Sequence, residues 1–131
     1  CAIAHALSDA GAQSLGIFDI DRDRESRLID TLNLRSKSLA KHAPPQPEGY
    51  ELIVNATPLG VAVSDGSAIC MDGLTSAKFV ADIVTPRQGD TPLVTRAKRL
   101  GCKTLTGTDL FNSATDLMRE FFLNDCAAGG A

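Results

Sequence analysis

The first twenty residues combine a helix of small side chains with an apolar strand that ends in a carboxylate. Residues 2–11 read AIAHALSDAG, whose small side chains allow close packing, and Gly11 is expected to end this helix. The run 14–19 then predicts a short strand ending at Asp19. This order is typical of the back half of a dinucleotide-binding βαβ unit. We expect the first strand and its Gly-rich phosphate turn to lie before Cys1, so that the chain is a truncated fragment.

The rest of the chain alternates between helical and strand patterns. Helices are expected over 23–34, 91–100 and 109–123, and strands over 50–55, 79–84 and 102–105. The predicted fold class is therefore α/β, a Rossmann-like parallel sheet with helices on both faces and its first strand missing. Truncation leaves two sheet edges open, or a partner chain, for example in a homodimer, fills the gap.

All 131 residues are expected to form one domain, 1–131, with a frayed tail at 124–131. The proline-rich part of the segment 35–48 is predicted to be a surface connection and not a domain boundary. In the last helix we expect four apolar side chains to be buried, namely Leu110, Leu117, Phe121 and Phe122.

Composition excludes several classes of function. The net charge is −3, and the basic residues are scattered, which argues against a nucleic-acid partner. No apolar run approaches membrane-spanning length. The four cysteines and two histidines show no metal-ligand spacing, so we expect no metal and interpret the cysteines as structural thiols in a reducing cytoplasm.

Asp19 is the first candidate cofactor contact. A carboxylate at the end of the second strand can accept the hydroxyls of an adenosine ribose, and it repels a 2′-phosphate, which favours NAD over NADP. The alternative is a structural role as a helix cap or turn acid. The neighbours Asp21, Arg22 and Arg24 leave the cofactor choice open, because either arginine could pair with a 2′-phosphate. Asp21 could equally be the N-cap of the next helix.

The second candidate is the loop Asn55-Ala56-Thr57-Pro58, which directly follows an apolar strand and leads into Leu59-Gly60. Ligands of α/β sheets bind at the carboxyl ends of strands, and this loop offers an amide, a hydroxyl and small residues there. A purely structural turn explains the same residues equally well. Asp82, inside another apolar strand, is expected to have a buried hydrogen-bond partner.

The segment NATPLG resembles the signature of the shikimate/quinate dehydrogenase family. AIAHALSDAGA is similar to the helix that follows that family's Gly-rich turn, and VADIV with TPLVTRAKRLGCKTLTG is similar to a later strand, helix and strand. The resemblance covers residues 2–123 and corresponds to the C-terminal, nucleotide-binding domain of the family.

The resemblance implies a two-domain oxidoreductase that transfers a hydride between NAD(P) and a cyclic hydroxy acid of the shikimate or quinate type. Its catalytic Lys–Asp pair belongs to an N-terminal domain that this chain lacks, so no catalytic residue is assigned here and the chain alone is expected to be inactive. The cofactor positions that carry over are Asp19, the loop from Asn55 to Pro58, Ile83 and Gly107.

Two positions depart from the family pattern. Thr85 stands where the family has a tyrosine, and Ala114 stands where it has a substrate-binding glutamine. Neither side chain can hold an acid substrate in the same way. Two alternatives therefore stay open: a member of the same lineage acting on another hydroxy acid, and a non-catalytic dinucleotide-binding module.

Overall fold

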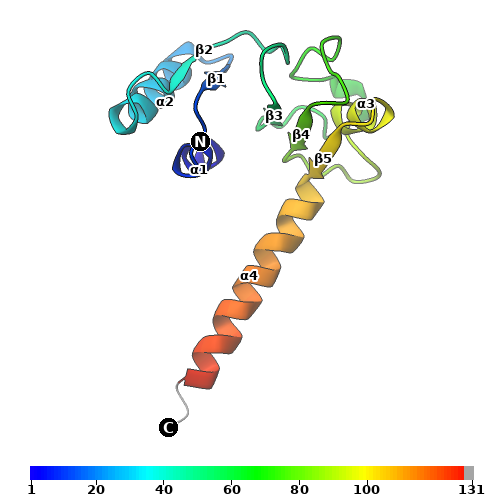
Figure 1. Ribbon diagram of the computed structural model, residues 1–131. Helices are drawn as coiled ribbons and strands as arrows, with labels where there is room; N and C mark the ends of the chain where they lie inside the picture. Colours follow the sequence, from blue (N-terminus) through cyan, green and yellow to red (C-terminus); the bar gives the residue numbers. More distant parts are fainter. Residues whose placement is uncertain (129–131) are drawn as a thin grey trace. The chain divides into compact units, whose positions relative to one another are not determined.

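The computed structural model describes residues 1–128 and divides the chain into two compact units (Figure 1). Unit 1 is Cys1–Gln46 and unit 2 is Pro47–Ala131. The division falls within the proline-rich segment, which we had expected to connect parts of one domain. No strand of unit 1 is hydrogen-bonded to a strand of unit 2 among the described residues, so each unit has its own sheet and its own core.

Unit 1 contains two helices and two strands: α1 (Ala2–Asp9), β1 (Leu15–Ile17), α2 (Arg22–Arg35) and β2 (Ala40–His42). The strands are parallel, with Leu15 opposite Ala40 and Ile17 opposite His42. Its core consists of buried apolar side chains from both helices, both strands and the connection before β2, namely Ala4, Leu15, Leu32, Leu39 and Ala40. Strand β2 was not predicted, because it has three residues and only Ala40 among them is buried.

Unit 2 contains a three-stranded parallel sheet in the order β3-β4-β5. Its elements are β3 (Leu52–Asn55), the 3₁₀ turn η1 (Val63–Asp65), β4 (Phe79–Asp82), α3 (Pro92–Arg99), β5 (Lys103–Thr106) and α4 (Gly107–Ala128). Helix α3 contributes Leu93 and Ala97 to the core, where they pack with Ile53, Val80 and Cys102. Thr91 caps α3 by accepting a hydrogen bond from the amide of Val94.

These elements confirm the predicted α/β fold class, with strands that are all parallel. In the doubly wound strand order 3-2-1-4-5-6, the first strand lies between the second and the fourth and pairs with both. No described strand pairs with both sheets.

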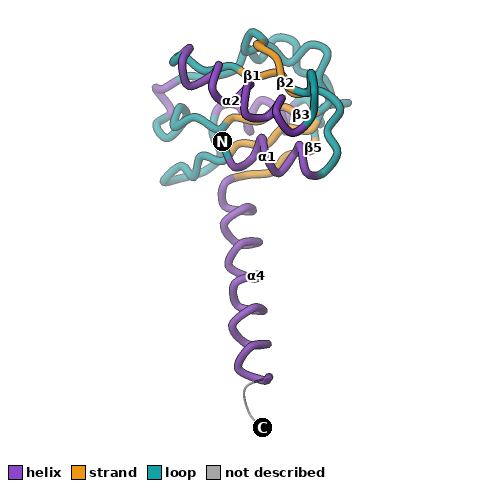
Figure 2. The backbone as a smooth tube through the Cα atoms, turned by 90° about the vertical axis from the view of Figure 1, so that its left-hand side faces the viewer, coloured by secondary structure: helices purple, strands orange, loops and turns teal. Residues whose placement is uncertain are grey.

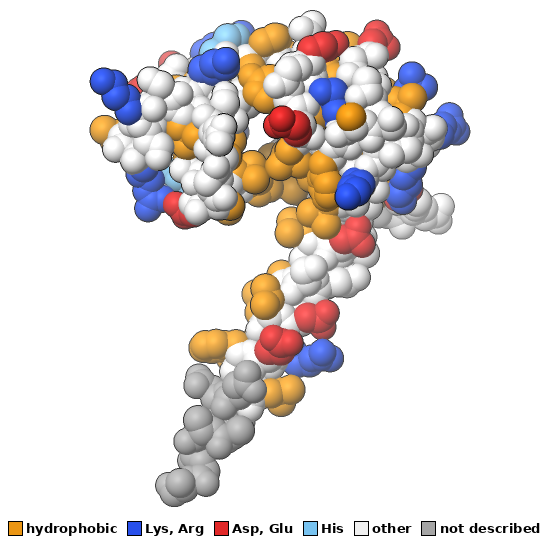
Figure 3. Space-filling model, in the orientation of Figure 1, with side chains coloured by type: hydrophobic (Ala, Val, Ile, Leu, Met, Phe, Trp, Pro, Cys, Tyr) orange, Lys and Arg blue, Asp and Glu red, His pale blue; other side chains and the backbone are white. Residues whose placement is uncertain are grey.

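Helix α4 is longer than predicted and continues through residues 124–128, which we expected to fray; residues 129–131 lie outside the described part (Figures 1 and 2). The expected burial of its apolar side chains is wrong. Leu110, Leu117, Phe121 and Phe122 are 43–67% exposed, and Figure 3 shows apolar side chains along the helix. Only the start of α4 meets the sheet, through β5, while α3 already fills the core of unit 2. None of the described helices is long and apolar enough to cross a membrane.

Candidate functional site

Asp19 lies two residues beyond β1, at the carboxyl end of that strand, as predicted. Its side chain is 29% exposed, and its two oxygens have different neighbours. Oδ1 accepts the amide N–H of Asp21 at 2.9 Å, and Oδ2 lies 3.3 Å from Nε of Arg24. The carboxylate therefore shapes the turn into α2, and it still has lone pairs with which to accept ligand hydroxyls.

Asp21 is the N-cap of α2, one of the two roles that the sequence left open. Its carboxylate accepts the amides of Asp23 and Arg24, both at 3.1 Å. The Arg24 amide, with the Arg24 guanidinium nearby, holds the pKa of Asp21 below its usual value. Arg24 also pairs with the carboxylates of Asp19 and Asp21 at 3.3 and 3.4 Å, so its charge is shared between two acids on one surface.

Glu25 is buried at the centre of this cluster, and sequence reasoning missed it. Its Oε2 accepts the backbone N–H of Asp19 at 2.9 Å, and Nη1 of Arg22 lies 3.0 Å from the same oxygen. Its Oε1 lies 2.5 Å from Nδ1 of His42, which donates in this bond because a carboxylate only accepts. The Asp19 amide, followed by His42 and Arg22, lowers the pKa of Glu25. Arg22 also lies over the ring of Phe18.

The loop after β3 is built by its own polar side chains. The buried amide of Asn55 donates to the carbonyl of Leu59, and its Oδ1 accepts from both the amide and the hydroxyl of Thr57. The Thr57 hydroxyl in turn accepts the amide N–H of Leu59 at 3.2 Å. Asn55 and Thr57 therefore hold the loop in shape, while Ala56 and Pro58 form its exposed surface.

Asp82 connects this loop to β4 and α3, and the expectation that it has a buried partner is confirmed. The residue is 2% exposed. Oδ1 accepts the Asn55 amide at 3.0 Å and the backbone N–H of Val84 at 3.1 Å, and Oδ2 accepts the Thr91 hydroxyl at 2.7 Å. Gly60, at φ +105°, packs next to Thr91 in a conformation that favours glycine. One carboxylate thus connects the loop after β3, strand β4 and the start of α3 at the carboxyl-terminal edge of the sheet.

Gly107 begins α4 directly after β5, and the loop after β4 passes close to it. A Cβ at this position would lie 2.4 Å from the carbonyl oxygen of Ile83 and 2.7 Å from Oγ1 of Thr85. The predicted positions Ile83, Thr85 and Gly107 are therefore brought together at the carboxyl ends of β4 and β5. Asp109 accepts the hydroxyl and the amide of Thr106 at this helix start, and these bonds lower its pKa.

Ala114, the second predicted substrate position, lies elsewhere on α4. It is exposed and lies seven positions after Gly107, which is about 10 Å along the helix axis. The structure therefore places Thr85 at the sheet edge and Ala114 two turns further along the helix.

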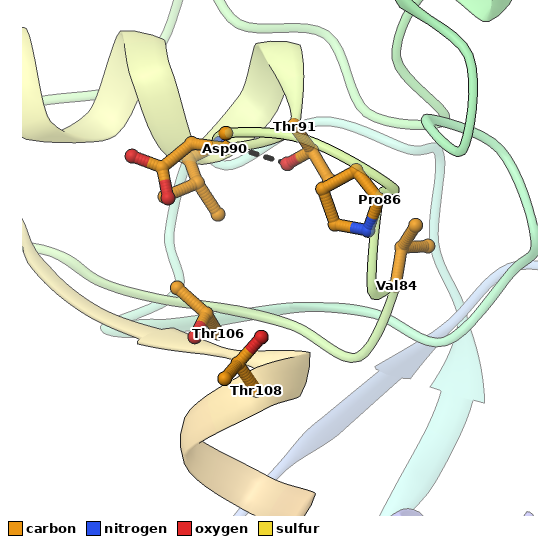
Figure 4. Close-up of a pocket in the computed structure, with 8 residues that line it drawn as sticks. Val84, Pro86, Asp90, Thr91, Thr106 and Thr108 are labelled. Atoms are coloured by element: carbon orange, nitrogen blue, oxygen red, sulfur yellow. Dashed lines mark hydrogen bonds between the residues drawn. The ribbon is translucent and has the colours of Figure 1, made fainter.

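A small pocket opens beside Thr91 at this edge of unit 2 (Figure 4). Val84 and Pro86 line it from the loop after β4, and Thr106 and Thr108 line it from the β5–α4 junction. Its volume of about 30 Å³ has room for water and not for a nucleotide. This pocket is therefore too small to hold the dinucleotide.

The predicted residues thus form two groups. Those of unit 1 surround the end of β1, and those of unit 2, apart from Ala114, follow β3, β4 and β5. In both groups the side chains lie at the carboxyl ends of parallel strands, where doubly wound sheets bind ligands. The fold and these two edges define the class as a Rossmann-like α/β domain.

No family model matches the chain, but the curated proteins to which it is similar are dehydrogenases of one family. The chain is 32% identical over 130 residues to the NAD(+) quinate/shikimate dehydrogenase of Corynebacterium glutamicum, covering 92% of this chain and 44% of that protein. It is also 32% identical to the NADP(+) shikimate dehydrogenase of Pseudarthrobacter chlorophenolicus, with 92% and 43% covered. The predicted resemblance to the shikimate/quinate dehydrogenase family is confirmed over 92% of this chain. The chain spans less than half the length of these relatives.

Solved structures agree. Quinate dehydrogenase from Corynebacterium glutamicum in complex with NAD matches with a TM-score of 0.72 and 31% identity, over 82% of this chain and 40% of that one. The ligand-free 5-ketofructose reductase of a Gluconobacter species also matches with a TM-score of 0.72, at 28% identity, over 84% and 42%. The shared fold therefore occurs in proteins named for different substrates.

Proposed function

We propose that this chain is the dinucleotide-binding domain of an NAD(P)-dependent oxidoreductase of the shikimate/quinate dehydrogenase type, with NAD preferred over NADP. In the whole protein a hydride would pass between the nicotinamide and a cyclic hydroxy acid. The proposal is supported by the likeness to an NAD(+) enzyme over nearly the entire chain and by the polar edges of the two parallel sheets.

The single observation that carries the cofactor part is the position of Asp19. Its partly exposed carboxylate stands just beyond β1, where a ribose hydroxyl can donate to it. Arg24 balances part of this charge without removing it, because the guanidinium is shared with Asp21. A 2′-phosphate at this place would meet one carboxylate directly and a second one close by, which disfavours NADP.

The residues that follow β3, β4 and β5 would hold the remainder of the cofactor. The exposed Ala56 and Pro58 leave room for a flat ring to approach the backbone, and Gly107 lets the loop after β4 pass close to the start of α4. When bound, NAD supplies the hydride-accepting nicotinamide. The described residues contribute binding and orientation, and we assign no proton-transfer residue among them.

The test is Asp19→Ser in the full-length protein, with Asp30→Asn, an exposed acid of α2, as the matched control. Isothermal titration should show a clear preference of the unmodified protein for NAD and a narrower preference in Asp19→Ser. Asp30→Asn should leave the preference unchanged. Tighter binding of NADP than of NAD by the unmodified protein would contradict the assignment and would point to Arg22 or Arg24 as the governing contact.

A second candidate function is reduction or oxidation of a different hydroxy acid or ketone. Thr85 and Ala114 replace the tyrosine and glutamine of the family pattern, and the likeness to a 5-ketofructose reductase favours a broader range of substrates. A site built to hydrogen-bond a substrate loses discrimination when such partners are lost. We therefore expect poor turnover of shikimate by the full-length protein.

A substrate panel decides between the two candidates. Shikimate and quinate are each assayed with NAD and NADP, and dehydroshikimate is assayed with NADH and NADPH, alongside the double variant Thr85→Tyr/Ala114→Gln. An increase in kcat/KM for shikimate in the variant would support the altered-substrate function. Efficient oxidation of shikimate by the unmodified protein, at about 10⁴–10⁸ M⁻¹s⁻¹, would refute it.

A further inference from the structure

The strongest unexplained feature of the molecule is the buried carboxylate of Glu25. Its residue is 4% exposed, whereas the other acids of the same segment, Asp19, Asp21 and Asp23, are partly or fully exposed. Glutamate is almost never buried without partners, because its charge must leave water. The contacts of Glu25 therefore indicate what its burial achieves.

One oxygen of Glu25 fixes the backbone of the ribose-binding turn. Oε2 accepts the amide N–H of Asp19 at 2.9 Å, across six residues of sequence. The same turn is closed from the other side by the Asp19 side chain, which accepts the Asp21 amide. With both bonds in place, the main chain around Asp19 cannot rotate freely, so the direction of its carboxylate is set before any ligand arrives.

The carboxylate of Glu25 also binds the guanidinium of Arg22. Nη1 of Arg22 lies 3.0 and 3.3 Å from the two carboxylate oxygens, and the guanidinium lies over Phe18 at 5.6 Å from the ring centroid. His42 binds the same carboxylate from β2 and anchors it to the sheet. The Arg22 side chain is 63% exposed, and Arg22 is one of the two arginines that the sequence offers as partners for a 2′-phosphate.

We propose that Glu25 is a positioning residue that sets cofactor preference: it orients Asp19 for the ribose hydroxyls and holds Arg22 away from a 2′-phosphate. This inference rests on the proposed function, since it presumes that a dinucleotide ribose binds at Asp19. The two effects belong to different chemical properties of one side chain. A neutral acceptor suffices to hold the Asp19 amide, whereas only a charged carboxylate holds the guanidinium of Arg22 strongly.

Two substitutions separate these effects. Glu25→Gln keeps an oxygen that can accept the Asp19 amide but removes the charge that holds Arg22. Glu25→Ala removes both. We expect Glu25→Gln to bind NAD with little change and to bind NADP about tenfold more tightly, because the released guanidinium gains a charge-assisted bond to the phosphate. Glu25→Ala should also weaken the binding of NAD, because the carboxylate of Asp19 is then no longer held in its orientation.

The experiment measures dissociation constants for NAD and NADP by isothermal titration of the full-length protein. It includes Arg22→Gln, the double variant Glu25→Gln/Arg22→Gln and the control Asp30→Asn. Arg22→Gln alone should leave both constants unchanged, and the double variant should return to the original preference. Arg22 is well exposed, so this variant tests the inference even if substitutions of the buried Glu25 prevent folding.

Three results would overturn the inference. Equal changes in the dissociation constants for NAD and NADP in Glu25→Gln would mean that the substitution loosens the whole site and does not set cofactor preference. A preference that stays shifted in the double variant would mean that Arg22 is not the released group. Weaker NADP binding in Arg22→Gln alone would mean that Arg22 already contacts the phosphate. If the unmodified protein binds neither dinucleotide, the proposed function itself fails, and this inference fails with it.

Discussion

The two units stabilise the carboxyl-terminal edges of their sheets with different kinds of interaction. In unit 1 the turn after β1 is held by the buried Glu25 and, at the surface, by ion pairs of Arg22 and Arg24, which are more than 60% exposed. In unit 2 the loop after β3 is held by Asn55, Asp82 and Thr91, which are 2–3% exposed and contain one formal charge. Exposed ion pairs are weak and sensitive to salt, whereas buried hydrogen bonds are expensive to break. The edge in unit 1 should therefore respond to conditions, and the edge in unit 2 should respond mainly to mutation.

The largest effect is expected from Asp82→Ala. The substitution removes acceptors for the Asn55 amide, the Val84 N–H and the Thr91 hydroxyl, and it leaves these buried donors unpaired. Unit 2 should lose about 3 kcal/mol of stability. Hydrogen exchange of the β3 and β4 amides measures the loss. Asp72→Ala, an exposed acid of the same unit, is the control, and equal effects of the two substitutions would refute the role of the network.

Gly107→Ala should have the next largest effect. Alanine normally favours a helix over glycine by about 1 kcal/mol, so a neutral site would become more stable. Here the new Cβ would lie 2.4 Å from the Ile83 carbonyl oxygen, and the backbone must shift. We expect a loss of about 2 kcal/mol by chemical denaturation. Ser113→Ala, at an exposed position of α4, should be neutral or stabilising; a stabilising Gly107→Ala would show that the loop after β4 yields easily.

Acid should weaken unit 1 through Glu25. Its pKa is lowered from 4.5 in the folded chain by the Asp19 amide, then by His42 and Arg22. A lowered folded pKa adds stability that is complete above the unfolded value and is lost as the pH falls through the folded value. Denaturation between pH 6 and pH 3 should therefore show a shallower acid loss in Glu25→Gln than in the unmodified protein. Identical slopes in the two proteins, with Asp30→Asn as reference, would contradict this.

The smallest effect is expected for Arg24→Gln. Its pairs with Asp19 and Asp21 are long and solvent-exposed, and such pairs contribute little. The melting temperature should fall by less than about 3 °C at low ionic strength, and the difference should vanish in 1 M salt. A large shift that persists in salt would mean that the turn in unit 1 depends on Arg24 as strongly as the loop in unit 2 depends on Asp82.

Much of the fold could be predicted from sequence, because apolar runs and breakers lie close together in the chain. The strand found at 52–55 and the helix found at 92–99 were expected within two residues of their bounds. The burial of α4 was not predictable in this way. Its apolar side chains follow a helical period, which indicates a face but does not say whether the described chain supplies a surface to cover it.

The site residues were predictable where the local sequence shows both a polar side chain and the end of a strand. Asp19, Asp82 and the loop from Asn55 stand at strand ends, which the local pattern reveals. Glu25 escaped, because in sequence it is one more acid in a charged helix start. Its buried position depends partly on His42, which lies seventeen residues away on a strand too short to recognise from sequence. Contacts of this kind require the tertiary structure.

The alignment of the three strands in unit 2 has a consequence for folding. Asn55, Asp82 and Thr106 lie directly opposite one another, each at the last position of its strand. A slip of β4 by one residue would place Ala81 or Ile83 opposite Asn55 and turn the carboxylate to the other face of the sheet. The amide and the carboxylate would then be buried without partners, at a cost of several kcal/mol. This cost disfavours misaligned sheets as the chain folds. The residues that shape the carboxyl-terminal edge of the sheet therefore also specify its strand register.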